Sequence, residues 1–98
     1  MLCVVHRIDN PEKTYLRKVH RDIHLVHLDK YRSKILLAGP YLDPQTGADR
    51  GSMFLMQTES LEEARRFAED DPYMQHGVFQ HLEVWQWTRK TGTISLDE

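Results

Sequence analysis

Cysteine is nearly absent from the sequence, which has Cys3 alone among its 98 residues. A single cysteine excludes a disulfide within the chain and is typical of a reducing compartment, so a cytoplasmic location is expected. Long apolar runs are absent too, since a run such as residues 35–38 is far shorter than a bilayer requires. No membrane-spanning helix is therefore expected. The N-terminus also lacks the basic region and long apolar stretch of a signal peptide.

An excess of basic residues is also missing. Thirteen lysines and arginines stand against 15 acidic residues, which gives a net charge of −2. Proteins that bind nucleic acid usually carry a concentrated basic surface, so no nucleic-acid partner is expected. No repeat, linker or low-complexity tract divides the chain. We therefore expect one domain over residues 1–90, followed by a flexible tail over residues 91–98.

The apolar pattern alternates between strand-like and helix-like stretches. It predicts strands over residues 2–8, 34–38, 52–58 and 81–88, helices over 14–31 and 60–70, an exposed loop over 41–50 and a turn over 73–77. The apolar residues of the first helix recur at steps of three and four: Leu16, Val19, Ile23 and Val26. This spacing predicts that they form the buried face of that helix.

The second helix has clear signals at both ends. Ser60 and Glu63 match a capping box, in which the Ser60 hydroxyl accepts from the Glu63 amide and the Glu63 carboxylate reaches back to the Ser60 amide. At the other end, Pro72 disfavours helical geometry at Asp71. The helix is therefore expected to end near Asp70.

This order of elements, βαββαβ, is typical of a ferredoxin-like α+β fold, with a four-stranded antiparallel sheet and both helices on one face. In the last strand Leu82 and Val84 point to one face, and Trp85 and Trp87 point to the other. Both faces are thus apolar, although two helices can cover only one. Burying a large apolar side chain is worth roughly 1.5–3 kcal/mol. We therefore expect a second copy on the open face, which predicts a homodimer through the sheet.

Three of the six histidines, His20, His24 and His27, share one side of the first predicted helix. They are open to three interpretations. They pack at the edge of the core, or His20 and His24 chelate a metal together with a carboxylate from elsewhere, or one of them performs acid–base catalysis. No HExxH or Cys/His motif accompanies them, and no phosphate loop or haem motif is present. We therefore expect neither a metal nor a cofactor.

A carboxylate partner for a catalytic histidine is available in the segment Asp70-Asp71-Pro72-Tyr73. Pro72 favours an extended Asp71, which can turn its side chain inward. The alternative is that the segment is simply a helix stop followed by a turn, for which Asp and Pro are the usual residues. A carboxylate beside an imidazole favours the charged ring and fixes which nitrogen carries the proton.

Several short motifs follow one another along the chain in an order that is typical of a known family. They are His24-Leu25 with Leu28, Leu36-Leu37-Ala38-Gly39-Pro40, Gly51-Ser52, Ser60-Leu61-Glu62-Glu63-Ala64, Asp71-Pro72-Tyr73 and Gly77-Val78-Phe79. In this order and spacing, the chain resembles the YciI family of small proteins with a YCII-related domain. The resemblance covers about residues 2–87 and implies a dimeric α+β barrel fold.

The resemblance also implies a site. In this family a histidine and an aspartate form a catalytic dyad, and the resemblance assigns these two roles to His24 and Asp71, with His20 and His27 as the alternatives to His24. The residues that line the family's pocket correspond to Ser52, Gly39 and Pro40. We add Tyr73, which belongs to the same Asp71-Pro72-Tyr73 motif as the dyad aspartate, as a substrate-binding residue. Because the family includes a dehydrochlorinase of chlorinated hydroquinones, the implied chemistry is proton abstraction beside a carbonyl.

Two functions follow from these observations. The first is a small dimeric enzyme that uses His24 and Asp71 for elimination or isomerisation of a small cyclic or aromatic carbonyl or hydroxyl compound. The second is a non-catalytic module that binds a small molecule or assists another protein. Turnover that depends on His24 distinguishes the first from the second.

Overall fold

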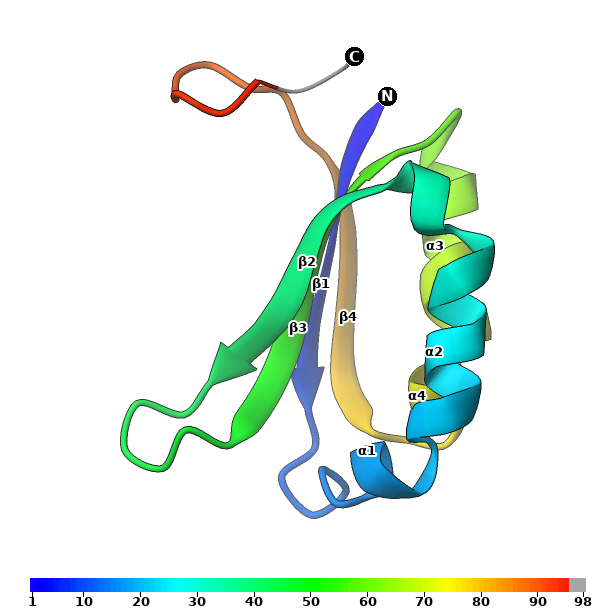
Figure 1. The fold of residues 1–98 in the computed structure, drawn as a ribbon, viewed down its shortest axis with the longest axis vertical. Helices are drawn as coiled ribbons and strands as arrows, with labels where there is room; N and C mark the ends of the chain where they lie inside the picture. The colour runs from blue at the N-terminus through cyan, green and yellow to red at the C-terminus, as the bar shows by residue number, and fades with distance from the viewer. Residues whose placement is uncertain (96–98) are drawn as a thin grey trace.

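A four-stranded antiparallel sheet with its helices on one side makes up the protein (Figure 1), which a computed structural model describes over residues 1–95. The elements are β1 (Leu2–Asp9), α1 (Leu16–Val19), α2 (Arg21–Lys30), the 3₁₀ turn η1 (Arg32–Lys34), β2 (Ile35–Leu42), β3 (Asp49–Gln57), α3 (Leu61–Asp70), α4 (Pro72–Gln75) and β4 (Phe79–Gln86). The strand order is β2-β3-β1-β4, and every neighbouring pair is antiparallel. This topology confirms the ferredoxin-like α+β fold.

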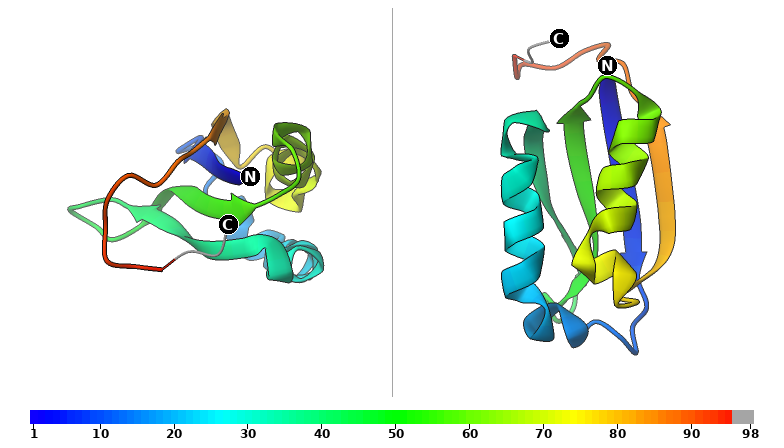
Figure 2. Two further views of the ribbon diagram at one scale, coloured as in Figure 1. Left: turned by 90° about the horizontal axis from the view of Figure 1, so that it is seen from above. Right: turned by 90° about the vertical axis from the view of Figure 1, so that its right-hand side faces the viewer.

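The core lies between the sheet and the two long helices, α2 and α3, which lie side by side over it (Figure 2). Alternation along β1 and β3 turns every second side chain toward the helices. The buried apolar cluster on this side comprises Cys3, Val5, Phe54, Met56, Ala64, Phe67 and Ala68. No helix within residues 1–95 has the length and apolar character needed to cross a bilayer.

The first predicted helix is interrupted. It is divided at His20, whose backbone angles of φ −111° and ψ 16° lie outside the helical region. Backbone hydrogen bonds continue on both sides, from the His20 amide to the Leu16 carbonyl and from the His24 amide to the His20 carbonyl. The prediction of one continuous helix over residues 14–31 was therefore wrong. The same range contains two successive helices, α1 and α2.

The buried face predicted for this helix was wrong for three of its four residues, whereas Leu16 packs against the buried cluster around Tyr73. Val19, Ile23 and Val26 are 64%, 48% and 60% exposed. Polar contacts decide the rotation of α2 instead, because they turn two histidines toward the core. His27 Nε2 donates to the Phe67 carbonyl on α3 at 2.8 Å. A buried carbonyl without a donor is expensive, and this bond together with the His24–Asp71 bond forms in the rotation that leaves Ile23 and Val26 exposed.

Strands β2 and β3 extend further than predicted. β2 continues to Leu42 and β3 begins at Asp49, so the expected loop over 41–50 shortens to residues 43–48. Asp43 Oδ1 accepts from the amides of residues 45 and 46, and Gly47 has a φ of +74°, which makes a tight turn possible. Pro40 lies within β2, which tolerates proline because it is an edge strand.

The start of α3 keeps half of the predicted capping box. The Glu63 amide donates to Ser60 Oγ at 3.1 Å, as expected. The Glu63 carboxylate accepts from the Glu59 amide at 3.3 Å, rather than from Ser60, and its other oxygen pairs with Lys34. The helix ends at Asp70 as predicted, while the short helix α4 (Pro72–Gln75) takes up the first part of the expected turn over residues 73–77.

The sheet face away from the helices is open and apolar. Trp85 and Trp87 are 60% and 38% exposed, whereas Leu82 and Val84 pack on the core, as the alternation predicted. After β4 the chain crosses the end of this face (Figure 2), where Arg89 and residues 91–94 line a cleft with Leu37, Leu55 and Trp87. The predicted tail over 91–98 has no helix or strand in residues 91–95, and residues 96–98 lie outside the described part.

Candidate functional site

A cavity of about 380 Å³ opens between the α1–α2 segment and the sheet. The residues that line it include five of the six proposed for the site from sequence: His24, Gly39, Pro40, Ser52 and Tyr73. The sixth, Asp71, is fully buried behind His24. The structure therefore brings together residues from α2, β2, β3 and the α3–α4 junction.

Asp71 holds His24 in place. Nδ1 of His24 donates to Oδ1 of Asp71 at 2.8 Å, and the same oxygen accepts from the Tyr73 amide at 2.9 Å. The second bond caps α4, and the extended backbone of Asp71, with φ −61° and ψ 126°, agrees with the restriction imposed by Pro72. The helix stop and the carboxylate partner are thus one and the same residue.

The other oxygen of Asp71 meets a buried arginine. Arg7 Nη1 donates to Oδ2 at 3.0 Å, and both side chains are completely shielded from solvent. Arg7 Nε donates to the Ser52 hydroxyl at 3.4 Å, and the guanidinium carbon lies 4.4 Å from the centre of the Phe79 ring. Its Nη2 has no hydrogen-bond partner within residues 1–95. Arg7, Asp71 and His24 therefore form a continuous polar chain that runs from the core to the cavity.

Asp71 is ionised at neutral pH. Burial, the largest influence, raises its pKa, but the His24 hydrogen bond, the Arg7 charge and the Tyr73 amide outweigh it and hold the pKa below the ordinary 3.8. An ionised carboxylate accepts hydrogen bonds only. Nδ1 of His24 must therefore carry a proton, which leaves Nε2 as the acceptor of a neutral ring.

The second nitrogen of His24 is free to meet a ligand. The side chain is 12% exposed and lines the cavity, and Nε2 has no hydrogen-bond partner among the residues described. The ring stacks on Tyr73, with centroids 3.8 Å apart and planes inclined by 5°. The Tyr73 hydroxyl donates to the Arg17 carbonyl at 2.9 Å, so Tyr73 contributes its ring to the site while its hydroxyl is engaged.

The two neighbouring histidines take other positions. His27 is bound to the Phe67 carbonyl, and His20 stacks on His76 with ring centroids 3.7 Å apart. Of the three helix histidines, only His24 lines the cavity. Among residues 1–95, His20 and His24 do not belong to a group of three metal-binding side chains. Their proposed joint metal site therefore lacks its third donor.

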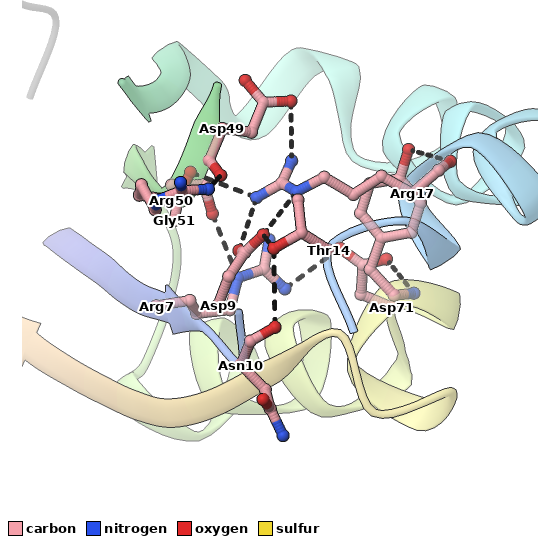
Figure 3. Close-up of polar contacts among 11 residues, drawn as sticks. Arg7, Asp9, Asn10, Thr14, Arg17, Asp49, Arg50, Gly51 and Asp71 are labelled. Carbon is pink, nitrogen blue, oxygen red and sulfur yellow. Dashed lines mark hydrogen bonds and ion pairs between the residues drawn. The ribbon is translucent and has the colours of Figure 1, made fainter. Parts of the chain in front are cut away.

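Arg17 lines the cavity, and several acceptors hold its guanidinium (Figure 3). Its guanidinium pairs with Asp9 at 2.8 Å and with Asp49 at 3.8 Å, and donates to the Gly51 carbonyl at 3.1 Å. Lys18 and Arg21 also line the cavity, but neither has an ion-pair partner in the described part of the chain. Four cations, Arg7, Arg17, Lys18 and Arg21, therefore stand against three carboxylates, Asp9, Asp49 and Asp71, which leaves one excess positive charge at the cavity.

Sequence reasoning missed Arg7, Asp9 and Arg17. A signal was present in the first strand, where alternation places Arg7 and Asp9 on the same face as Cys3 and Val5. Charged residues at two successive core-facing positions indicate buried partners, since an unpaired buried charge is strongly unfavourable. Nothing local to Arg17 indicates that it reaches Asp9.

Comparison with known proteins gives relatives that match nearly the whole chain. The protein YciI of Escherichia coli O6:H1 is 33% identical over 91 residues, which covers 86% of this chain and 93% of that protein. Protein YciI of Shigella flexneri matches to the same extent.

A solved structure matches just as fully. The 5-chloro-2-hydroxyhydroquinone dehydrochlorinase of Burkholderia phenoliruptrix, in complex with 2,5-dihydroxybenzoquinone, superposes with a TM-score of 0.85 at 32% identity. The match covers 92% of this chain and 96% of that chain. The family description that matches is the YCII-related domain, over residues 1–88. The chain therefore belongs to the YCII-related domain family.

Proposed function

We propose that the protein is a small enzyme in which His24 transfers protons to and from a cyclic or aromatic compound bearing carbonyl or hydroxyl groups. One observation carries this proposal: a buried, ionised Asp71 fixes the proton of His24 on Nδ1, so that Nε2 faces a ligand-sized cavity as a base. Positioned imidazoles of this kind commonly contribute rate factors of about 10²–10⁴.

The similar dehydrochlorinase supports the choice of reaction. Loss of HCl from a chlorinated hydroquinone to give a quinone breaks two O–H bonds and the C–Cl bond and forms one C–H bond. One hydroxyl proton moves to the ring carbon that bears chlorine, the second goes to a base, and chloride leaves. In this proposal Nε2 of His24 carries the first proton from oxygen to carbon and then takes the second. The Ser52 hydroxyl, which contacts Arg7, is placed to donate to an oxygen on which negative charge develops.

The first experiment is a turnover assay with 5-chloro-2-hydroxyhydroquinone, monitored by chloride release, alongside binding of 2,5-dihydroxybenzoquinone by titration calorimetry. Turnover that exceeds the rate in buffer supports the enzyme. Binding without turnover of this substrate and of related halogenated or carbonyl compounds supports the non-catalytic binding module instead, and overturns the proposed catalysis.

The positive wall of the cavity favours a substrate that carries a negative charge. We expect the double variant Lys18→Met/Arg21→Met to bind 2,5-dihydroxybenzoate about tenfold more weakly, because two partly exposed charges together contribute about 1–2 kcal/mol. The carboxamide 2,5-dihydroxybenzamide has the same shape without the charge, so its affinity should stay unchanged.

The matched control for this prediction is Arg65→Met/Arg66→Met, which removes two exposed cations from α3 outside the cavity lining. It should bind both ligands like the native protein. Equal losses of affinity for the acid and the amide in the Lys18/Arg21 variant would contradict a role for charge.

The proposal includes a homodimer that pairs the open sheet faces. Light scattering should give about twice the 11.6 kDa of one chain. Trp85→Glu should shift the mass toward the monomer, because it places a charge in the centre of the interface. Val26→Glu is the matched control, since Val26 is also 60% exposed but lies on the outer side of α2. A monomeric native protein, or equal effects of both variants, would contradict pairing through the sheet.

A further inference from the structure

The open sheet face carries a polar cluster that the proposed catalysis does not use. His6 on β1 and His81 and Glu83 on β4 all project to this side, because His6 pairs with Glu83 and Ile8 pairs with His81 in the antiparallel register. The cavity with His24 lies on the other face of the sheet. The two sets of side chains therefore act independently.

These three side chains bring metal-binding atoms together. One donor atom from each, a ring nitrogen of His6 and of His81 and a carboxylate oxygen of Glu83, lies within 4.8 Å of the others. His81 Nε2 is already 2.5 Å from Glu83 Oε2. Because all three positions lie on paired strands, little backbone ordering would be needed to close the donors around an ion.

Outer contacts already orient two of the donors. The Tyr41 hydroxyl is 2.8 Å from His6 Nδ1, and the indole of Trp85 donates to Glu83 Oε1 at 2.8 Å, which leaves Oε2 on the His81 side. Metal-binding histidines and carboxylates are characteristically held by such second partners, which fix the ring orientation and raise ligand basicity.

The position of Tyr41 depends on a glycine. A Cβ on Gly51 would lie 2.8 Å from the Tyr41 ring and 2.3 Å from the Arg7 carbonyl. The absence of a side chain at Gly51 therefore lets the Tyr41 ring cross β3 and reach His6. The aromatic residue, the glycine and the histidine together form a support for the cluster.

We propose that His6, His81 and Glu83 bind a divalent transition-metal ion of the Zn²⁺ type. Two imidazoles and one carboxylate are a donor set that Zn²⁺ accepts in proteins, with a fourth position left for water or another ligand. Binding replaces the short His81–Glu83 contact by two bonds to the ion.

The test is a Zn²⁺ titration of chelator-treated, tag-free protein by calorimetry at pH 7.5, with bound metal counted by elemental analysis. We expect about one ion per chain, and His81→Ala and Glu83→Gln should each weaken binding at least about tenfold. Both side chains are well exposed, so the variants should fold, and circular dichroism verifies this. The titration is made on the protein as it assembles in solution, because the proposed dimer uses the same face.

His76→Ala is the matched control, since it removes an exposed histidine outside the cluster. It should bind Zn²⁺ like the native protein. The proposal is overturned if the native protein binds no Zn²⁺ at high micromolar concentrations, or if His81→Ala retains native affinity. The variant His24→Gln leaves the cluster intact, so it should bind Zn²⁺ with the affinity of the native protein. The Zn²⁺ titration therefore tests the metal site independently of the turnover assay, which tests His24.

Discussion

Replacing Asp71 by alanine should lower the free energy of unfolding by about 3–5 kcal/mol. The carboxylate is fully buried and accepts hydrogen bonds from Arg7, His24 and the Tyr73 amide. Its removal leaves the equally buried Arg7 charge without a counter-ion and the first turn of α4 without its cap. Urea denaturation followed by tryptophan fluorescence measures the loss.

The neighbouring residue supplies the control. Asp70 is exposed at the end of α3, and its replacement by alanine should change the unfolding free energy by no more than about 0.5 kcal/mol. If Asp71→Ala were as mild as Asp70→Ala, the buried ion pair would contribute little, and the polar chain from Arg7 to His24 would not be a structural unit.

The same carboxylate links stability to pH. Because the pKa of Asp71 in the folded protein lies below the ordinary 3.8, ionised Asp71 stabilises the fold above its unfolded-state pKa. This contribution is lost as pH falls through the lowered folded-state pKa. The difference in unfolding free energy between the native protein and Asp71→Asn should therefore be largest near neutral pH and shrink below about pH 4. A difference independent of pH would contradict an ionised Asp71.

The second large effect concerns catalysis. His24→Gln should lower turnover of the substrate identified in the chloride-release assay by about 10²–10⁴-fold, because it removes the base without emptying the position. The His24 side chain is only 12% exposed, so its replacement must fill the same space. Glutamine is close to histidine in size and therefore keeps most of this packing. Affinity for 2,5-dihydroxybenzoquinone should change much less, since the cavity wall is otherwise intact.

His20→Gln is the control for this variant. His20 lies on the same helical segment but stacks on His76 and does not line the cavity, so turnover should stay near the native value. Full activity of His24→Gln would contradict His24 as the base. Equal losses in both variants would point to a general disturbance of the α1–α2 segment.

The strand and helix order was predictable because it depends on local signals. The alternation predicted for residues 81–88, which overlaps the observed β4, the Ser60 cap and the stop at Pro72 each act within a few residues. Asp71 and His24 could also be proposed from the sequence. The backbone restriction that Pro72 imposes on Asp71 is local, and His24 is one of three histidines in the first predicted helix that were considered as the base. The motifs shared with the YCII-related family narrowed that choice.

What the sequence did not predict depends on contacts between distant residues. The rotation of α2, which exposes Ile23 and Val26, follows from the bonds that His24 and His27 make to α3 and its end. Apolar periodicity alone favours the opposite face, because it assigns no energy to a buried carbonyl that needs a donor. The pairing of Arg7 with Asp71 likewise spans 64 positions, so only the assembled sheet brings the two together.

A small aromatic ligand is proposed to bind against His24 in the cavity. The most direct test is to follow the side-chain nitrogen signals of the six histidines by NMR while 2,5-dihydroxybenzoquinone is added, with His24→Gln used to assign the His24 signal. The His24 signal should shift most and should saturate, while those of His6 and His81 on the opposite sheet face stay in place. A His24 signal that does not respond, with shifts confined to other histidines, would place the ligand elsewhere and contradict the site.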